Sequence, residues 1–218
     1  MDHSSYNPGM ARPVGRPRSF DRGDALRRAA HLFWQHGFSG TSTRMLASAL
    51  GISTSSLYSA FGTKGALFDE AVRTYALRYS AIYAAAVAEP TVHGVIDRLL
   101  TDSATEFTRT DEGHPGCLTS SAVMADAPPT LDVRGYVAEL QRSDGARLRA
   151  RLEQAEATGD LPPAVGAAAL TELVQTVWQG LSCRAELGAT RDELVGMARL
   201  AAGLLAPGAH AVGAPAPR

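Results

Sequence analysis

The 218-residue sequence contains a single lysine, Lys64, beside twenty arginines, and only two cysteines, Cys117 and Cys183. Two cysteines are too few for a disulfide framework. The longest apolar run is too short to cross a bilayer, and the first residues, MDHSSYNPGMARP, lack the apolar core of a signal peptide. These absences argue against a secreted scaffold and a membrane protein, and we expect a cytoplasmic protein.

The sequence also lacks the local motifs of common enzymes. It has no phosphate-binding loop, no nucleophile elbow and no HExxH pattern. His114 and Cys117, in HPGC, are two soft ligands where a closed zinc site takes four, so neither a metal nor a cofactor is predicted. Metal sensing and thiol sensing remain the less favoured interpretations of this segment. A helical enzyme would need a cluster of titratable groups, and the sequence reveals none.

Negative charge is scarce in the first third of the chain. Residues 1–64 hold eight of the 21 Lys and Arg but only three of the 22 Asp and Glu, a net charge of +5, whereas the remainder carries −6. A basic first third on an acidic body indicates that the first third binds a polyanion. Charge asymmetry of this size also arises by chance, so it carries little weight alone.

The hydrophobic pattern between residues 19 and 206 predicts an all-α protein. Strand alternation does not persist, and Gly or Pro recurs at intervals that end helices. We expect a disordered basic arm (1–18), a helix-turn-helix DNA-binding domain (19–65), a helical effector-binding and dimerisation domain (66–206) and a disordered tail (207–218). The predicted helices are 22–37, 43–50, 54–60, 64–87, 92–110, 118–125, 131–157, 164–186 and 191–205.

The second and third predicted helices have the spacing of a helix-turn-helix. Ser42 and Ser53 are the expected N-caps, and Gly51 makes the short turn between the two helices. The second helix of such a pair lies in the major groove, with its N-terminal residues nearest the base edges. The third helix is therefore the expected recognition helix.

The recognition helix carries no charge. Thr54, Ser55 and Ser56 are small hydroxyl residues that allow close approach to base edges or phosphates, and Tyr58 can reach a phosphate with its hydroxyl. The alternative is that these hydroxyls only cap a surface helix, which accounts for Ser53 but not for the run. Affinity would then come from cations around the helix.

Lys64 opens the fourth predicted helix, where a cation opposes the helix dipole. A DNA phosphate bound at this helix N-terminus would explain the lysine, and the alternative is an exposed lysine with no role. Arg44 and the arm would add positive charge. Arg16 and Arg18, in GRPR, resemble basic segments that enter AT-rich minor grooves, although many such arms only aid solubility.

The segment 20–75 resembles the DNA-binding domain of the tetracycline-repressor family of bacterial regulators. The resemblance rests on ALRRAAHLFWQHGFSGTS, ALGIS and SLYSAFGTKGALF, which cover about a quarter of the chain. It implies about nine helices, three of them for DNA, and a two-fold homodimer. By motif position, the implied DNA contacts are Thr43, Arg44, Thr54, Ser55, Ser56, Tyr58 and Lys64, with Tyr58 and Lys64 as phosphate contacts.

The last two predicted helices carry long apolar stripes. In this family these helices usually pair with their copies in a four-helix bundle, so the resemblance implies that the stripes form the dimer interface. The alternative, that both stripes serve only the core of one protomer, remains open. The predicted interface residues are Leu170, Val174, Val177, Leu181, Met197, Leu200 and Leu204.

A small apolar or amphipathic effector would bind among the middle helices. The candidate pocket residues are Tyr79, Tyr83, Phe107, Met124, Tyr136 and Trp178, each of which also suits a core position. The favoured function is a dimeric repressor that such an effector releases from a palindromic operator. The alternative is a DNA-binding regulator controlled by a protein partner or by its abundance. A closed pocket would favour the first and a solid core the second.

Overall fold

The computed structural model describes residues 21–109, 115–120, 126–161 and 165–206, and over these residues it contains eight helices and no strand. The all-α prediction is confirmed. Within the described ranges, no helix combines the length and hydropathy needed to cross a membrane. The helices are α1 (Arg22–Gly40), α2 (Thr43–Leu50), α3 (Thr54–Phe61), α4 (Lys64–Val87), α5 (Val92–Phe107), α6 (Val133–Thr158), α7 (Ala167–Glu186) and α8 (Arg191–Leu205).

The first four helices begin where their capping residues predict. Asp21, Ser42, Ser53 and Thr63 each accept a hydrogen bond from a backbone N–H two or three residues later. Such a bond satisfies one of the N–H groups that the first helical turn leaves without a partner. The short-range signals in the sequence therefore position the start of each helix in the DNA-binding end.

Two glycines set the turns between these helices. Gly37, which was predicted to end the first helix, breaks it with φ 71°, although a further turn continues to Gly40. Gly51 ends α2 with φ 66°, in the left-handed conformation that glycine adopts without strain. The turn between α2 and α3 is therefore as short as the helix-turn-helix prediction requires.

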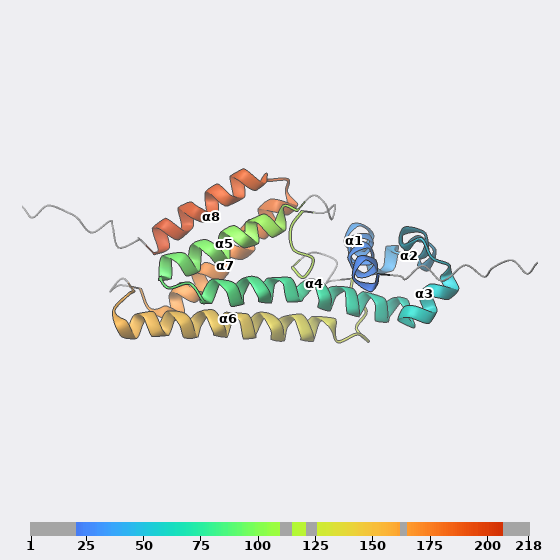
Figure 1. Ribbon diagram of the computed structural model, residues 1–218, viewed down its shortest axis with the longest axis horizontal. Helices are drawn as coiled ribbons and strands as arrows, with labels where there is room; N and C mark the ends of the chain where they lie inside the picture. Colours follow the sequence, from blue (N-terminus) through green and yellow to red (C-terminus); the bar gives the residue numbers. More distant parts are fainter. Residues whose placement is uncertain (1–20, 110–114, 121–125, 162–164, 207–218) are drawn as a thin grey trace, which may run out of the picture.

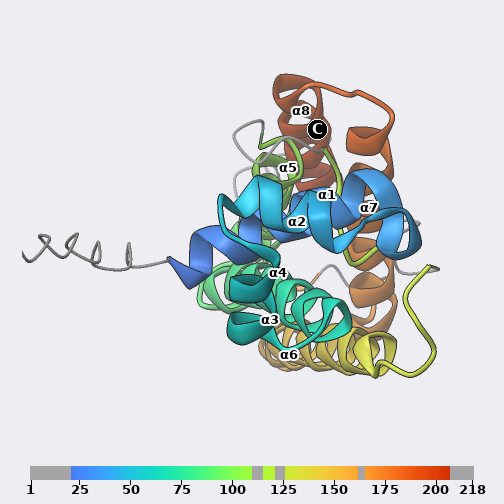
Figure 2. The ribbon, with the colours of Figure 1, turned by 90° about the vertical axis from the view of Figure 1, so that its right-hand side faces the viewer.

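Helix α4 joins the two parts of the molecule. Its N-terminal half packs against α1, where Phe68 contacts the rings of Phe33 and Phe38 at centroid distances of 4.9 and 5.2 Å. Its C-terminal half packs between α5 and α6 (Figure 1). Viewed along the long axis, α1 and α2 cross above α4, and α3 lies over the end of the α4–α6 pair (Figure 2). One continuous helix thus reaches from the DNA-binding end into the larger helical body.

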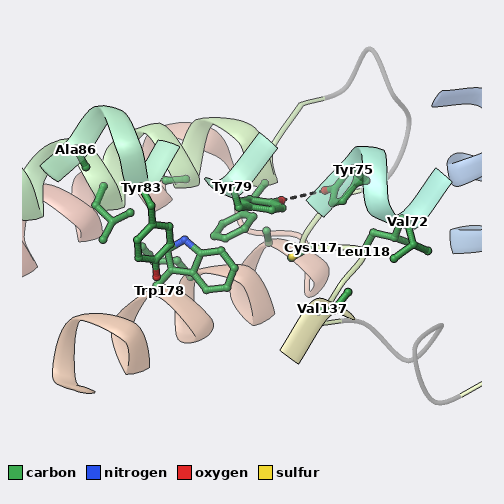
Figure 3. Packing of buried hydrophobic residues seen from close by; sticks show 14 of the residues in the cluster. Val72, Tyr75, Tyr79, Tyr83, Ala86, Cys117, Leu118, Val137 and Trp178 are labelled. Carbon is green, nitrogen blue, oxygen red and sulfur yellow. Dashed lines mark hydrogen bonds between the residues drawn. The ribbon is translucent and has the colours of Figure 1, made fainter. Parts of the chain in front are cut away.

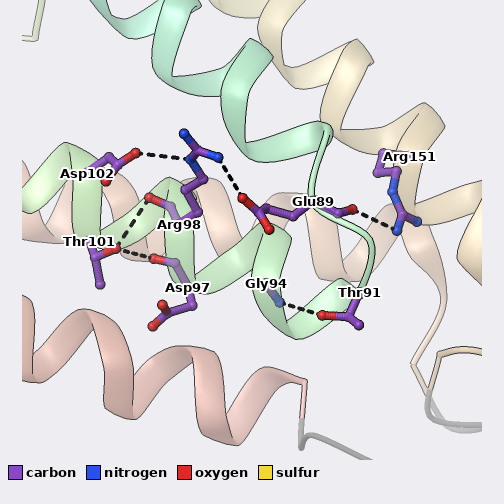
Figure 4. A network of polar contacts seen from close by, with 8 residues as sticks. All are labelled: Glu89, Thr91, Gly94, Asp97, Arg98, Thr101, Asp102 and Arg151. Atoms are coloured by element: carbon purple, nitrogen blue, oxygen red, sulfur yellow. Dashed lines mark hydrogen bonds and ion pairs between the residues drawn. The ribbon is translucent and has the colours of Figure 1, made fainter.

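A polar network fixes the far end of this body, at the turn between α4 and α5. Arg98 binds Glu89 at 2.6 Å and Asp102 at 3.4 Å, while Arg151 of α6 donates to the carbonyl oxygens of Glu89 and Pro90 (Figure 4). These exposed ion pairs contribute little individually. Together with the Arg151 bonds, they tie α6 to the end of α4.

The remaining boundaries differ slightly from the predictions. Helix α8 begins and ends as predicted, and α7 begins at Ala167 rather than residue 164. Residues 118–120 form a turn, and the rest of the predicted helix 118–125 lies outside the described residues. The predicted arm and tail, 1–18 and 207–218, also lie outside them.

Candidate DNA interface and internal pocket

The first turn of α3 presents a cluster of serine hydroxyls. Ser53 Oγ accepts a hydrogen bond from Ser56 N and lies 2.8 Å from both Ser55 Oγ and Ser56 Oγ. All three serines are exposed. A hydroxyl has one donor and two acceptor positions, so Ser53 Oγ is fully used by its three partners, whereas Ser55 and Ser56 each retain capacity for a bond to DNA. The surface is therefore polar and uncharged, as the sequence indicated.

The other predicted DNA contacts surround this cluster. Thr54 and Arg44 are exposed, Thr43 is half-buried, and Tyr58 has 47% of its surface exposed although it is a large aromatic residue. Leu57, on the opposite side of α3, is fully buried. Thr54, Arg44 and Tyr58 are therefore accessible to a partner, and Thr43 is partly so. Arg16 and Arg18 lie outside the described residues.

Lys64 has an internal role that the sequence did not predict. Its Nζ donates hydrogen bonds to the carbonyl oxygens of Phe38 and Thr41, each at 3.0 Å, and lies 4.1 Å from the centre of the Phe38 ring. The ammonium therefore satisfies carbonyl groups at the end of α1, where a cation is favourable. Two of its three N–H donors are occupied, so one remains for the predicted phosphate contact.

Arg22 fixes the other end of the recognition helix. Its Nη1 donates to Ala60 O at 3.0 Å, its Nε binds Glu70 Oε1 at 2.6 Å, and its guanidinium lies 4.6 Å from the centre of the Phe61 ring. The bonds to Glu70 raise the pKa of Arg22. No local motif identified this contact, because its partners are 38 and 48 residues away.

Asp126 connects the larger helical body to the DNA-binding end. It accepts hydrogen bonds from Ser39 N at 2.7 Å and from Ser39 Oγ at 2.8 Å. The hydrogen bond from Ser39 N, and to a lesser extent that from Ser39 Oγ, lowers the pKa of Asp126. A Cβ atom at Gly37 would lie 2.7 Å from Asp126 Oδ2, so this contact requires a glycine at that position. Sequence analysis did not identify Asp126.

A cavity of about 550 Å³ lies between α4, α6 and α7. Tyr79 and Tyr83 line it from α4 and Trp178 from α7, as predicted, and Thr119 also reaches it. Figure 3 shows these aromatic side chains gathered in the core beside Cys117 and Leu118. The volume falls within the range of about 300–1,000 Å³ for small-molecule sites.

Two other predicted pocket residues, Phe107 and Tyr136, do not line this cavity. Phe107 is buried behind it, 5.5 Å from Tyr79 and 5.1 Å from Trp178 between ring centres. Tyr136 lies under the Arg73 guanidinium, 4.1 Å from ring centre to Cζ. These two predictions are corrected, because aromatic type alone does not distinguish a pocket wall from the core. Met124 lies outside the described residues.

Hydrogen bonds orient the aromatic residues of the cavity. Trp178 Nε1 donates to Ser103 Oγ at 2.7 Å, and the hydroxyls of Tyr75 and Tyr79 lie 2.9 Å apart. Burial raises the pKa of Tyr75, Tyr79 and Tyr83, so all three phenols are neutral at physiological pH. The wall is therefore aromatic, and its hydroxyls carry no charge.

A carboxylate completes the cavity wall. Asp144 of α6 is 4% exposed, and its Oδ2 accepts a hydrogen bond from Ser80 Oγ at 2.7 Å. Its Oδ1 accepts no hydrogen bond, and the nearest cation, Arg147 Nη1, is 3.5 Å away. Burial raises the pKa of Asp144 against the opposing effects of Ser80 and Arg147. Sequence analysis missed this residue, since a lone aspartate in a polar helix segment gives no signal.

Cys117 is buried beside the aromatic cluster. Its Sγ lies 3.0 Å from Thr119 Oγ1, and burial raises the pKa of the thiol. The thiolate is the reactive form of cysteine, so this environment disfavours thiol chemistry. His114, the other half of the HPGC segment, lies outside the described residues.

The apolar stripes of α7 and α8 divide between the protomer core and its surface. Leu170, Val174 and Leu181 are buried within the protomer, so their side chains are not available to a partner. The interface prediction is corrected for these three. The other predicted residues are Val177, which is half-buried, and Met197, Leu200 and Leu204, which are exposed.

The exposed apolar residues define an outer surface on α7 and α8. Leu173 of α7 and Leu187, the residue after α7, are exposed, as are Met197, Leu200 and Leu204 of α8, where Leu200 and Leu204 reach 65% and 73%. We call these five residues the α7–α8 surface. It contains five of the seven large apolar residues that are exposed in the described part of the chain. Exposed apolar residues are candidates for an interface, so Leu173 and Leu187 extend the predicted set of interface residues.

Comparisons with known proteins identify relatives over the whole of this architecture. The family model described as "Bacterial regulatory proteins, tetR family" matches residues 25–71, which cover α2, α3 and most of α1. The HTH-type transcriptional repressor ComR of Escherichia coli (strain K12) is 31% identical over 186 residues, covering 84% of this chain and 88% of ComR. The repressor BdcR of the same strain is 27% identical over 88% of this chain and 92% of its own length.

Solved structures of bacterial regulators are also similar to this chain. A cysteine mutant of the regulator CifR, complexed with a 26-base-pair operator DNA, is 31% identical and superposes with a TM-score of 0.72, covering 86% of this chain and 98% of that one. A regulator from Rhodococcus sp. RHA1 is 36% identical with a TM-score of 0.59, covering 85% and 99%. The similarity therefore extends through both the helix-turn-helix and the larger helical body.

Proposed function

Because the chain belongs to the TetR family of bacterial regulatory proteins, we propose that it is a homodimeric repressor that a small effector releases from a palindromic operator. Membership makes it a DNA-binding transcriptional regulator rather than an enzyme. Repression, dimerisation and effector response are the proposed refinements. The observation that carries the proposal is the coexistence of an exposed recognition helix, α3, and a ligand-sized cavity whose wall includes the next helix, α4.

DNA binding is proposed to occur through the N-terminal domain, residues 19–65. Ser55 and Ser56 would approach base edges, while Tyr58 and Arg44 would bind phosphates. Arg16 and Arg18 would enter the adjacent minor groove. CifR, which shares the fold and 31% identity, has been solved with operator DNA, and this supports the same use of α3 here.

Dimerisation is proposed to occur through the α7–α8 surface, within the effector-binding and dimerisation domain 66–206. Two copies related by a two-fold axis would bury its exposed leucines against each other. A palindromic operator needs two recognition helices about 34–36 Å apart, which one protomer cannot supply. Leu173 and Leu187 replace the three buried residues in the predicted interface.

The effector is proposed to act through two segments that contact the DNA-binding end, α4 and the residues beside Asp126. Helix α4 carries Tyr79 and Tyr83 in the cavity wall and Lys64 at its first turn. Asp126 accepts hydrogen bonds from Ser39 and precedes α6, which forms another wall of the cavity. A ligand that favours one spacing of these segments would change the distance between recognition helices.

The alternative is a regulator without a small effector, controlled by a protein partner or by abundance. A cavity of about 550 Å³ with aromatic walls favours the effector-responsive function, because its volume and lining suit a small ligand, although its rim at Arg142, Arg149 and Glu172 is open to solvent.

The proposed function is tested by selecting an operator from random DNA with the purified chain and measuring its affinity by fluorescence anisotropy. We expect a palindromic site, two or a multiple of two chains for each site by sedimentation, and release by compounds that bind the cavity. A non-palindromic site bound by a single chain would contradict the homodimeric repressor. Unchanged DNA affinity with a cavity-bound compound would instead favour regulation without an effector.

A further inference from the structure

The strongest unexplained feature of the cavity is the carboxylate of Asp144. A buried polar atom without a hydrogen bond is unfavourable, and for an ionised group the cost is larger. Ser80 satisfies Oδ2, but Oδ1 accepts no hydrogen bond while the side chain is 6% exposed. Asp144 lines the cavity, so a ligand bound there can supply the missing donor.

The basic residues at the cavity do not donate a hydrogen bond to Asp144 Oδ1. Arg142 and Arg149 also line the cavity, but both are exposed and form ion pairs along α6, with Glu139 at 2.6 Å and with Glu153 at 2.8 Å. Arg147 Nη1 forms an ion pair with Asp144 Oδ1 at 3.5 Å but donates no hydrogen bond to it, and the Arg147 side chain is half exposed, so the ion pair is open to solvent. The charges on the rim are therefore paired with one another.

The wall opposite α6 adds a second preference for positive charge. Glu172 of α7 lines the cavity and contributes another carboxylate. Tyr79, Tyr83 and Trp178 contribute aromatic rings, whose faces attract a cation within about 6 Å of the ring centre. Trp178 Nε1 and the Tyr79 hydroxyl already have partners, so these two residues mainly offer ring surface.

We propose that the cavity binds an amphipathic amine, whose ammonium group donates to Asp144 Oδ1 while its apolar body lies against Tyr79, Tyr83 and Trp178. The proposal rests on the proposed function, because it takes this cavity for the effector site, and it specifies the chemical class of the effector. An ammonium has three N–H donors and forms a charge-assisted bond with a carboxylate, which is stronger than the bond from a neutral hydroxyl.

Three probes with a phenyl ring, a similar length and different charge test the ligand class: 4-phenylbutylamine, 4-phenylbutan-1-ol and 4-phenylbutyrate. Their affinities for the full chain are measured by isothermal titration calorimetry at neutral pH and low salt. We expect the amine to bind at least tenfold more tightly than the alcohol and the carboxylate to bind most weakly. The proposal is overturned if the alcohol or carboxylate binds as tightly as the amine, or if none of the three binds at millimolar concentration.

The substitution Asp144→Asn tests the residue. We expect it to remove the preference for the amine over the alcohol while leaving the alcohol affinity within about twofold. Asp102→Asn is the matched control, because Asp102 is an exposed aspartate of α5 and its loss changes the net charge equally. Retention of the preference in Asp144→Asn, or its loss in Asp102→Asn, overturns the assignment to Asp144. If Asp144→Asn does not fold, the probe comparison on the unchanged chain still decides the ligand class.

Operator binding, measured in parallel, separates this inference from the function on which it rests. Selective binding of the amine without any change in operator affinity would preserve the ligand class and contradict the effector role. Release of the operator by the alcohol and the amine at equal concentrations would preserve the effector role and contradict the amine preference.

Discussion

Two aspartates near opposite parts of α4 have opposite environments. Asp126, at the DNA-binding end, accepts two hydrogen bonds from Ser39, and these lower its pKa. Asp144, in the cavity wall, has one hydrogen-bond donor, and burial raises its pKa. Asp126 receives its hydrogen bonds from within the protein and so stabilises a permanent contact with Ser39. A buried carboxylate that lacks a donor marks a place where a ligand can contribute stability.

The largest effect is expected when the proposed dimer dissociates, because a monomer has one DNA-binding end and one cavity instead of two. Leu200→Arg places a charge in the α7–α8 surface and should give a folded monomer. Loss of the linked second half-site should reduce affinity for a palindromic operator about 100-fold or more. Sedimentation measures the mass, circular dichroism the helicity, and anisotropy the affinity.

Leu77→Arg provides the control, since Leu77 is an exposed leucine of α4 outside the α7–α8 surface. We expect this variant to stay dimeric with normal operator affinity. If Leu200→Arg also stays dimeric and retains full affinity, the interface lies elsewhere.

Lys64→Met and Arg44→Met distinguish a residue that stabilises the fold of the DNA-binding end from one that binds DNA. Lys64→Met keeps the apolar stem and removes the bonds to Phe38 and Thr41, so we expect the free energy of unfolding to fall by about 2 kcal/mol. Arg44→Met, which removes an exposed cation, should keep the stability and make the salt dependence of DNA binding shallower by about one unit of log K per log salt.

Urea unfolding and binding titrations at several salt concentrations measure both quantities. A Lys64→Met variant with unchanged stability and a shallower salt dependence would make phosphate binding, rather than the internal contact, the role of Lys64.

Ser55→Ala tests the uncharged surface of the recognition helix. If Ser55 reads a base edge, its loss should relax the preference at one operator position in each half-site by about 1 kcal/mol. Selection from random DNA compares the variant with the unchanged chain and with Ser48→Ala, which removes an exposed hydroxyl of α2. An identical preferred site for all three would place base recognition on other residues, Arg44 first.

The smallest effects concern the pH dependence of the two aspartates, and they have opposite signs. Because the folded pKa of Asp126 is lowered, its stabilising contribution is present above about pH 4 and is lost as the pH falls through the folded value. Asp126→Asn should therefore lower Tm at neutral pH, and its difference from the unchanged chain should shrink below about pH 4.

Asp144 should behave in the opposite way. Its folded pKa is raised, so its contribution is complete below about pH 4 and is lost as the pH rises through the folded value. Asp144→Asn should therefore gain Tm relative to the unchanged chain as the pH rises from 4 to 7. Thermal unfolding across this range measures both variants, and parallel curves for the two would contradict the comparison.

The sequence predicted the features that depend on neighbouring residues. The caps of α1 to α4 act over two or three positions, and Gly51 acts on its own backbone, so each can be recognised locally. Once Ser53 is recognised as the cap of α3, the serines and threonine that follow it are predicted to lie in the first turn of that helix. These signals are sufficient to position the helix-turn-helix.

The contacts that join the two ends were not predictable, because their partners are distant in the sequence. Asp126 and Ser39 are 87 residues apart, and Asp144 and Ser80 are 64 apart. Periodicity identified an apolar stripe on α7, but a stripe has the same period whether it packs against its own core or a partner. Leu170 and Leu173 are therefore distinguished only by the arrangement of α5, α7 and α8.

Lys64 also makes the contact between α1 and α4 accessible to chemistry. It is the sole lysine, so the chain has one ε-amino group, and the carbonyls it binds belong to the last turn of α1 and to the residue that caps it. An amine-reactive reagent modifies this group only when the contact opens, and a protease specific for lysine has one site, between residues 64 and 65. The rate of either reaction therefore measures local opening at the junction of α1 and α4, with no introduced label.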